Sequence, residues 1–212
     1  MAKVLAVTEA VKSLAQAESR FGLRPAPEEA FFSEWRGNLP ELTGAELTHL
    51  QRLRERLLYH RAGGDLLEGS VMLLAASPLL ELAGLYDPPF RMRAEAAIEV
   101  TVDDGEEVLR GRIDVLILQG QLWALVVESK KTTIPTRSAL PQALAYLLAS
   151  PQSERPLFGL LINGDDVLFV KLTQQPERLY GLSRAFSLYT LASEWREVLR
   201  VLKKLAGLIT ES

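Results

Sequence analysis

Acidic residues and a lysine recur at strand-like spacing in the middle of the chain. Gly111-Arg-Ile-Asp114 is followed fourteen residues later by Glu128-Ser-Lys130. Carboxylates bind Mg²⁺ or Mn²⁺ through oxygen, and such an ion lowers the pKa of bound water and offsets charge on a phosphate. A lysine ammonium beside the metal can hold the attacking water or stabilise charge at phosphorus. These residues are therefore candidates for metal-dependent hydrolysis of phosphodiester bonds.

Composition removes several other kinds of chemistry. The 212 residues include no cysteine, which excludes disulfides, zinc–thiolate sites and cysteine nucleophiles. The two histidines, His49 and His60, lie in an arginine-rich segment with helical spacing, so a histidine zinc site or a Ser-His-Asp triad has little support. The net charge of −3 argues against coating nucleic acid by bulk charge, although a local basic groove remains compatible with it.

Two apolar stretches could be mistaken for targeting or membrane segments. Glu9 and Lys12 interrupt the N-terminal one, which is typical of an amphipathic helix and not of a signal peptide. The other, residues 66–85, contains Glu68, Pro78 and Glu81, so a membrane span is not expected. We expect a cytoplasmic protein with no membrane partner.

The first third of the sequence has helical periodicity. Helices are expected over residues 4–19, 28–35 and 42–58, the last with a capping box formed by Thr43 and Glu46. A fourth runs from Asp65 towards Ala83, with Pro78 kinking or dividing it. We therefore expect an N-terminal helical region over residues 1–64, packed as a layer on a core of residues 65–212.

After Pro89 the spacing changes to that of strands. The expected order is a three-strand meander, a helix, a strand pair, a further short strand and a closing amphipathic helix. This order predicts an α/β domain with a mixed sheet, an antiparallel meander plus further strands, flanked by helices. The expected elements are strands 90–102, 108–118 and 122–130, helix 138–150, strands 156–162, 167–172 and 180–188, and helix 191–209.

Two hairpin registers decide which acids share a face. A two-residue turn at Asp104-Gly105 places Glu95 directly opposite Asp114. If residues 119–121 form a three-residue loop, Leu118 pairs with Leu122 and Glu128 becomes a diagonal neighbour of Asp114, on the same face as Lys130 and opposite to Ser129. A slip of one residue in this second hairpin would send Glu128 to the other face. With both registers, three acids meet, and their mutual repulsion calls for a cation.

An aspartate on one strand followed by a hairpin and an apolar strand ending in Glu-x-Lys resembles the PD-(D/E)XK nuclease superfamily. The resemblance covers residues 68–148, and Gly-x-Ile-Asp with Glu-Ser-Lys-Lys is most similar to the N-terminal nuclease domain of type I restriction enzyme R subunits. It implies a restriction-endonuclease-like core, metal ligands at Asp114 and Glu128, and a catalytic lysine at Lys130. It also implies a further acid on the preceding helix or strand, for which Glu68 and Glu95 are the candidates.

A second motif follows the Glu-x-Lys strand. Gln142 and Tyr146 lie four residues apart on one helix face, and they resemble the Gln-x-x-x-Tyr motif of the superfamily's helicase-nuclease and restriction branches. The resemblance implies that they position DNA and the site. Lys131 and Arg137 lie nearby and are candidates for contacts with the DNA backbone. The arginines at 52, 54, 56 and 61 are interpreted as a solvated helix face, and Asn163-Gly-Asp-Asp166 as a turn.

These expectations amount to a Mg²⁺- or Mn²⁺-dependent endodeoxyribonuclease, with Asp114, Glu128 and Glu95 as metal ligands and Lys130 and Glu68 completing the catalytic set. The alternative is a non-catalytic DNA-binding or assembly module that keeps the nuclease fold. A homodimer and a larger restriction or repair complex both remain open. The restriction subunits carry a large motor segment that this sequence lacks, so no ATP-driven translocation is implied.

Overall fold

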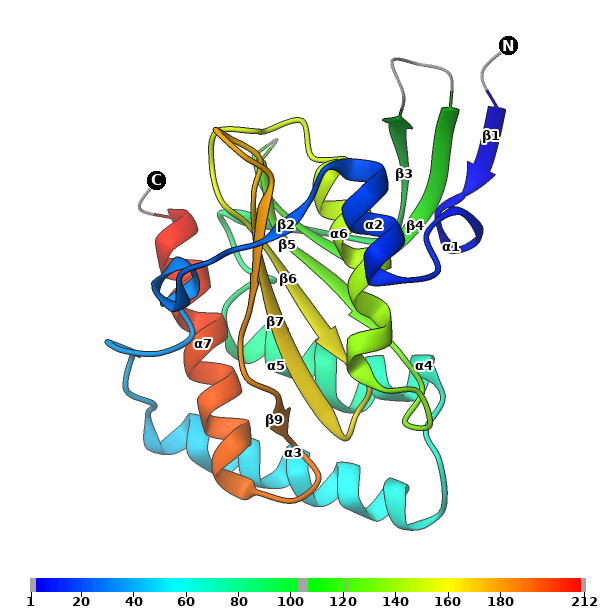
Figure 1. Cartoon of the computed structure of the whole chain (residues 1–212). Helices are drawn as coiled ribbons and strands as arrows, with labels where there is room; N and C mark the ends of the chain where they lie inside the picture. The colour runs from blue at the N-terminus through cyan, green and yellow to red at the C-terminus, as the bar shows by residue number, and fades with distance from the viewer. Residues whose placement is uncertain (1–2, 103–106, 121, 211–212) are drawn as a thin grey trace.

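A mixed β-sheet forms the centre of the molecule in the computed structural model, which describes residues 3–102, 107–120 and 122–210 (Figure 1). Its path runs β1-β4-β5-β6-β7-β8-β2, with β3 paired to β4 and β9 paired to β7. The β1–β4, β5–β6 and β2–β8 pairs are parallel and the others are antiparallel. The strands are β1 (Lys3–Ala6), β2 (Arg24–Pro25), β3 (Phe90–Val102), β4 (Glu107–Gln119), β5 (Leu122–Ser129), β6 (Leu157–Ile162), β7 (Asp166–Thr173), β8 (Leu179–Leu182) and β9 (Phe186–Ser187).

Helices cover both faces of this sheet. In Figure 1 α2 and α6 lie together in front of the strands, and α4 and α5 lie behind them. The helices are α1 (Val7–Ala10), α2 (Leu14–Phe21), α3 (Gly44–Ala62), α4 (Glu68–Val71), α5 (Ser77–Leu82), α6 (Leu140–Leu148) and α7 (Ala192–Thr210). Short 3₁₀ turns span Glu29–Phe32 and Thr136–Ala139, and a π-helical turn, Met72–Ala76, joins α4 to α5.

Two apolar cores result, one on each face of the sheet. One packs α3, α5 and α7 against the sheet, with Leu57, Leu80 and Trp195 fully buried in it. The other packs α2 and α6 against the opposite face, with Phe21 and Leu144 buried in it. Because both faces are covered, the central strand β6 is buried along its whole length, as expected for a strand without polar alternation.

Several predicted elements are confirmed. The strands after Pro89 and the helices at 138–150 and 191–209 occur within a few residues of their expected bounds. The capping box is present, because Thr43 Oγ1 accepts the Glu46 N–H at 3.2 Å and Glu46 Oε2 accepts the Thr43 N–H at 2.6 Å. Pro78 lies in the first turn of α5, directly after the π-helical turn, so the proline does mark a division of the helix.

The N-terminal region differs from the predicted helical layer. Residues 4–19 form β1, α1 and α2 instead of one helix, because the apolar start of the chain pairs with the edge of β4. Residues 28–35 contain only the 3₁₀ turn Glu29–Phe32, and β2 just before it pairs with β8. The segment 180–188 divides into β8 and β9. The Asp104-Gly105 turn lies outside the described residues, as does Gln121. Within the described ranges, no helix is long and apolar enough to cross a membrane.

Candidate active site

The β3–β4 hairpin has the predicted register, but it contains an irregularity at the site. Phe90 pairs with Gln119, and the pairing then passes from Ala94–Val115 to Ala96–Ile113, so Glu95 stands opposite Asp114 without being paired to it. Glu95 has a φ of 50°, a left-handed conformation that is uncommon outside glycine.

The side chain of Glu95 consequently lies away from the other acids. It is exposed, and its Oε2 accepts a hydrogen bond from Arg112 Nη1 at 3.2 Å. The structure therefore brings Glu95 to Arg112 and not to Glu128 or Lys130. The register expectation was correct, and the expectation of a shared cluster fails because the strand bends at Glu95 itself.

The β4–β5 hairpin departs twice from its predicted register. Leu118 pairs with Trp123 and not with Leu122, which is a slip of one residue and would by itself turn Glu128 to the other face. A β-bulge then lies between Trp123 and Leu125, so that Ile117 pairs with Leu125 and Val115 with Val127. The second offset cancels the effect of the first on the face. The pairing ends at Val115–Val127, one residue short of Asp114 and Glu128, so the predicted diagonal pairing of these two acids is not present.

The Gly111-Arg-Ile-Asp114 motif lies at a gap in the strand pairing of the sheet. One edge of β4 is occupied by β3. On the other edge β1 pairs with β4 as far as Arg110, and β5 pairs with it from Val115 onwards. Among the described strands, none pairs with residues 111–114 on this second edge. On this edge the backbone of the motif can therefore form hydrogen bonds with side chains in place of a neighbouring strand.

Tyr146 of α6 fills part of this gap. Its hydroxyl oxygen accepts the Arg112 N–H at 3.3 Å and Gln142 Nε2–H at 2.8 Å. Its ring lies against Gly111, where a Cβ would come within 2.5 Å of the ring. The structure thus brings together the predicted pair of Gln142 and Tyr146 and places it next to Asp114. Burial, followed by the charge of Glu128, raises the pKa of the Tyr146 hydroxyl, so this group remains a neutral phenol.

Asp114 is held by Ser129. Its Oδ2 accepts both the Ser129 backbone N–H at 2.7 Å and the Ser129 hydroxyl at 2.8 Å. Oδ1 accepts no hydrogen bond from the residues that the structure describes. Strand alternation predicts Ser129 on the face opposite to Glu128 and indicates no role for it. The strand parity behind that placement carries no information about the backbone N–H, which points along the sheet towards β4.

Glu128 is the most unusual group in this region. Its side chain is 0% exposed, and neither carboxylate oxygen has a hydrogen-bond partner in the described part of the chain. Burial, and then the nearby charge of Asp114, raise its pKa to about 9, although Lys130 and the nearby Asp114 backbone N–H act in the opposite direction. A buried carboxylate with two unbonded oxygens is costly unless a proton or a cation accompanies it.

Lys130 lies between two carboxylates. Its Nζ is 3.9 Å from Glu128 Oε2 and 3.9 Å from Glu68 Oε1. Glu68 is the first residue of α4, and its side chain is about half exposed. Of the two candidates for the further acid, the structure brings Glu68 into the site and leaves Glu95 outside. Lys131 and Arg137 are exposed in the connection between β5 and α6, and neither makes a polar contact with Asp114 or Glu128 within the described residues.

These groups fit a divalent cation. The unbonded oxygens of Glu128 and Asp114 Oδ1 are hard oxygen donors of the kind that Mg²⁺ and Mn²⁺ prefer. The fit rests on two carboxylates, because in residues 3–102, 107–120 and 122–210 no three His, Cys, Asp or Glu side chains gather as a metal-binding group. Water and substrate phosphate commonly supply the remaining ligands of Mg²⁺.

Comparisons with known proteins give little further identification. No family model and no curated protein matches the chain. A solved structure described as "the fragment structure of a putative HsdR subunit of a type I restriction enzyme from Vibrio vulnificus YJ016" aligns with a TM-score of 0.41 and 20% sequence identity. The alignment covers 64% of this chain and 25% of that one.

Proposed function

We propose that the chain is a metal-dependent nuclease that hydrolyses DNA phosphodiester bonds with Mg²⁺ or Mn²⁺. The observation that carries this proposal is the buried carboxylate of Glu128, which lies beside Asp114 and Lys130 and whose two oxygens accept no hydrogen bond from the described residues. A structural carboxylate would be expected to have donors around it. The missing donors are explained if the side chain is arranged to bind a cation.

Each residue then has a distinct role. Asp114 and Glu128 hold the cation, and Ser129 keeps one Asp114 oxygen occupied so that the other is directed to the metal. Bound there, the ion supplies an activated water and offsets charge on the scissile phosphate. Lys130 holds the attacking water or stabilises charge at phosphorus, and Glu68 limits the positions open to its ammonium group.

The remaining predicted residues act around this centre in the proposal. Tyr146 and Gln142 hold the backbone of residues 111–114 in place beside Asp114. Lys131 and Arg137 are exposed cations on the β5–α6 connection and are proposed to contact the DNA backbone. Glu95 is left out of the metal site because its carboxylate is engaged with Arg112.

One observation favours a second candidate, a non-catalytic module for DNA binding or assembly. Since the pKa of Glu128 is raised to about 9, this carboxyl group is protonated at neutral pH in the metal-free chain. A neutral carboxylic acid can remain buried without a cation. The fold therefore does not require metal, and a chain that has lost catalysis could keep all of these residues.

Cleavage and metal titration together separate the two candidates. Purified chain is incubated with single- and double-stranded DNA in Mn²⁺ or Mg²⁺, and Mn²⁺ binding is followed by calorimetry without DNA. We expect cleavage that is abolished in Asp114→Ala and Lys130→Ala and retained in Glu99→Ala, an exposed acid of β3. Mn²⁺ bound without cleavage of either DNA would refute the catalytic claim for this chain. Neither binding nor cleavage would favour the non-catalytic module.

A further inference from the structure

A reciprocal pair of hydrogen bonds links the loop after β5 to the segment that leads into α4. The Thr132 N–H donates to the Leu66 carbonyl at 3.1 Å, and the Leu66 N–H donates to Thr132 Oγ1 at 3.0 Å. Both residues are buried. Two hydrogen bonds between the same two residues fix their relative orientation as well as their separation, since a single bond would leave the loops free to pivot.

The spacing of this pair along the chain connects it to the candidate site. Leu66 lies two residues before Glu68, and Thr132 lies two residues after Lys130. Two residues span about 7 Å at most, so each site residue is tethered closely to one member of the pair. Glu68 Oε1 and Lys130 Nζ are 3.9 Å apart. The Thr132–Leu66 pair is therefore a connection, close along the chain to both residues, that can determine how these two side chains meet.

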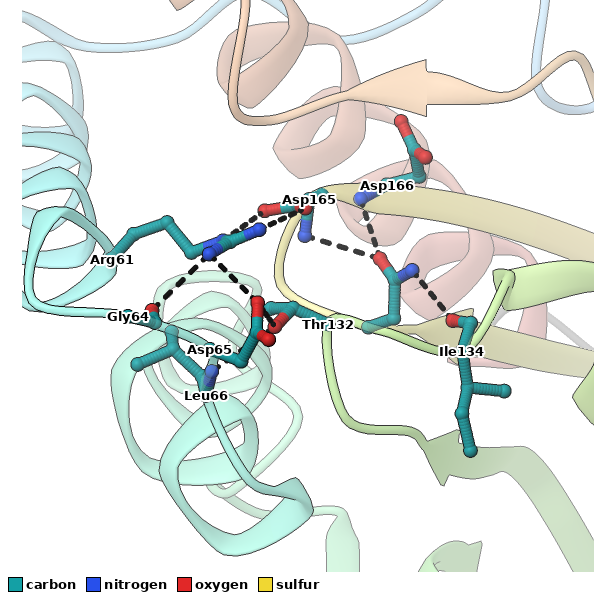
Figure 2. Close-up of polar contacts among 9 residues, drawn as sticks. Arg61, Gly64, Asp65, Leu66, Thr132, Ile134, Asp165 and Asp166 are labelled. Atoms are coloured by element: carbon teal, nitrogen blue, oxygen red, sulfur yellow. Dashed lines mark hydrogen bonds and ion pairs between the residues drawn. The ribbon is translucent and has the colours of Figure 1, made fainter.

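A set of charged contacts braces the pair from outside (Figure 2). Thr132 Oγ1 donates to Asp65 Oδ1 at 3.3 Å, and Asp65 forms an ion pair with Arg61 Nη1 at 3.0 Å. Arg61 also donates from Nε and Nη2 to the two oxygens of Asp165 at 3.0 and 3.2 Å, and from Nη1 to the Gly64 carbonyl. A two-pronged guanidinium–carboxylate contact fixes both distance and angle.

The anchor of this brace is itself rigidly built. Asp165 belongs to the turn between β6 and β7, in which Asn163 Oδ1 accepts the N–H groups of Asp165 and Asp166 at 3.1 and 2.7 Å, while Asn163 Nδ2 donates to the Ile134 carbonyl at 2.9 Å. Gly164 in the same turn leaves room for Thr132, whose Cγ2 would lie 3.3 Å from a Cβ at that position. The end of α3, the approach to α4, the loop after β5 and this turn thus form one connected unit.

We propose that Thr132 is a positioning residue that holds Glu68 against the Lys130 ammonium, with Asp65 and Arg61 as its brace. The orientation of the lysine is then set by a network that lies outside the metal-binding residues. The consequence for catalysis rests on the proposed nuclease function, but the positioning itself does not. The relative position of the Glu68 and Lys130 side chains can be tested without substrate or metal.

The test is a variant cycle read by NMR on the full chain labelled with ¹³C-lysine. The chain has seven lysines, so the Lys130 side-chain signal can be assigned by its loss in Lys130→Arg. We expect Glu68→Gln to shift this signal, and Thr132→Val to shift it in the same direction. In a chain that already carries Glu68→Gln, Thr132→Val should add no further shift. Thr132→Ser, which keeps the hydroxyl, should restore the native position.

Thr136→Val is the matched control. Thr136 is a buried threonine of the same connection, but its hydroxyl donates to the Asp166 carbonyl, and we expect the Lys130 signal to stay in place. If Thr132→Val fails to fold, Asp65→Ala removes the brace at an exposed residue and is judged by the same cycle. An unmoved Lys130 signal in Thr132→Val, or an equal shift in both backgrounds, overturns the proposal.

Cleavage assays on the same variants separate this proposal from the proposed function. If the chain cuts DNA, Thr132→Val should lower kcat about tenfold with the KM for DNA unchanged, and should cause no additional loss in the Glu68→Gln background. An additive loss of kcat in the two backgrounds contradicts the positioning role. Lysine shifts that follow the expected cycle in a chain that cuts no DNA would keep the positioning role and refute the nuclease function.

Discussion

The ring of Tyr146 lies directly on Gly111, at a distance that leaves no room for a Cβ. This contact joins the first residue of the motif on β4 to a residue on α6, thirty-five positions later. Because the Tyr146 hydroxyl accepts the N–H of Arg112, it also bonds the backbone of β4 at a point where none of the described strands pairs with this edge. The position of the Tyr146 ring thus requires a glycine at residue 111, and the two residues together occupy the gap in the strand pairing.

Gly111→Ala should therefore displace Tyr146 and destabilise the fold. Inserting a methyl group into a filled space costs about 1–3 kcal/mol, and more where the neighbouring ring cannot move. Urea unfolding measures the change in the free energy of unfolding. Gly207→Ala is the control, since it lies in α7 with open space around it and should be neutral or stabilising. Equal stability of the two variants would contradict the close contact.

Tyr146→Phe should weaken the sheet at the gap with little change in volume. The Arg112 N–H and Gln142 Nε2–H lose their acceptor, and these part-buried donors then cost less than the about 1–3 kcal/mol of a fully buried unsatisfied donor. The free energy of unfolding and the hydrogen exchange rate of the Arg112 amide report the loss. Tyr86→Phe removes a hydroxyl bonded to Ser77 elsewhere and should leave the Arg112 amide unchanged. An unaffected exchange rate in Tyr146→Phe would rule out the bond.

Glu128 predicts an unusual dependence of stability on pH in the metal-free chain. Its pKa is 4.5 in the unfolded chain and about 9 in the folded chain, so between these values the folded state binds more protons. Stability must then fall as pH rises through this window, with a contribution of up to about 1.4 kcal/mol per pH unit.

Urea unfolding in EDTA between pH 6 and pH 8.5 measures this dependence, and Glu128→Gln should remove it. The amide is neutral at every pH, so the variant should gain stability over the wild type as the pH rises. Glu99→Gln changes an exposed acid of β3 and should leave the slope as it is. If the free energy of unfolding depended on pH in the same way in the wild type and in Glu128→Gln, folding would not raise the pKa of this carboxyl group.

Ser129→Ala should weaken metal binding while leaving the fold intact. The variant keeps the backbone N–H bond to Asp114 but loses the hydroxyl bond, so the carboxylate is free to rotate. Loss of a group that orients a metal ligand typically costs about 10–100-fold in affinity. Calorimetric titration with Mn²⁺ gives the dissociation constant, and Ser138→Ala, at an exposed position, serves as the control. An unchanged constant would mean that the backbone bond alone orients Asp114.

Much of the fold follows from local patterns, and the departures have identifiable physical causes. Alternation after Pro89 predicted the meander, and the pairing of Gln119 with Phe90 has the expected register. The N-terminal helix was overpredicted because β1 is defined by its pairing with the distant β4, which no local spacing reveals. The few apolar residues at the start of the chain are compatible with a paired strand as well as with an amphipathic helix.

The site could be predicted in its members more than in its geometry. Glu128 lies near Asp114 and near Lys130, and Gln142 contacts Tyr146, while the roles predicted for these residues stay predictions. Glu95 does not join them, since a left-handed residue inside a strand cannot be anticipated from alternation. Ser129 and Thr132 were missed because they act partly through backbone N–H groups, for which residue type carries no signal.

The bulge in β5 has a consequence for the length of the chain between the two acids. The turn and the bulge each shift the pairing by one residue, and together they pair Val127, the residue before Glu128, with Val115, the residue after Asp114. Removing a single residue near Trp123 would therefore rotate the acid by half a turn about its strand without altering any group in the site. The number of residues separating the two carboxylates, and specifically whether it is even or odd, is constrained as strictly as their chemical identity.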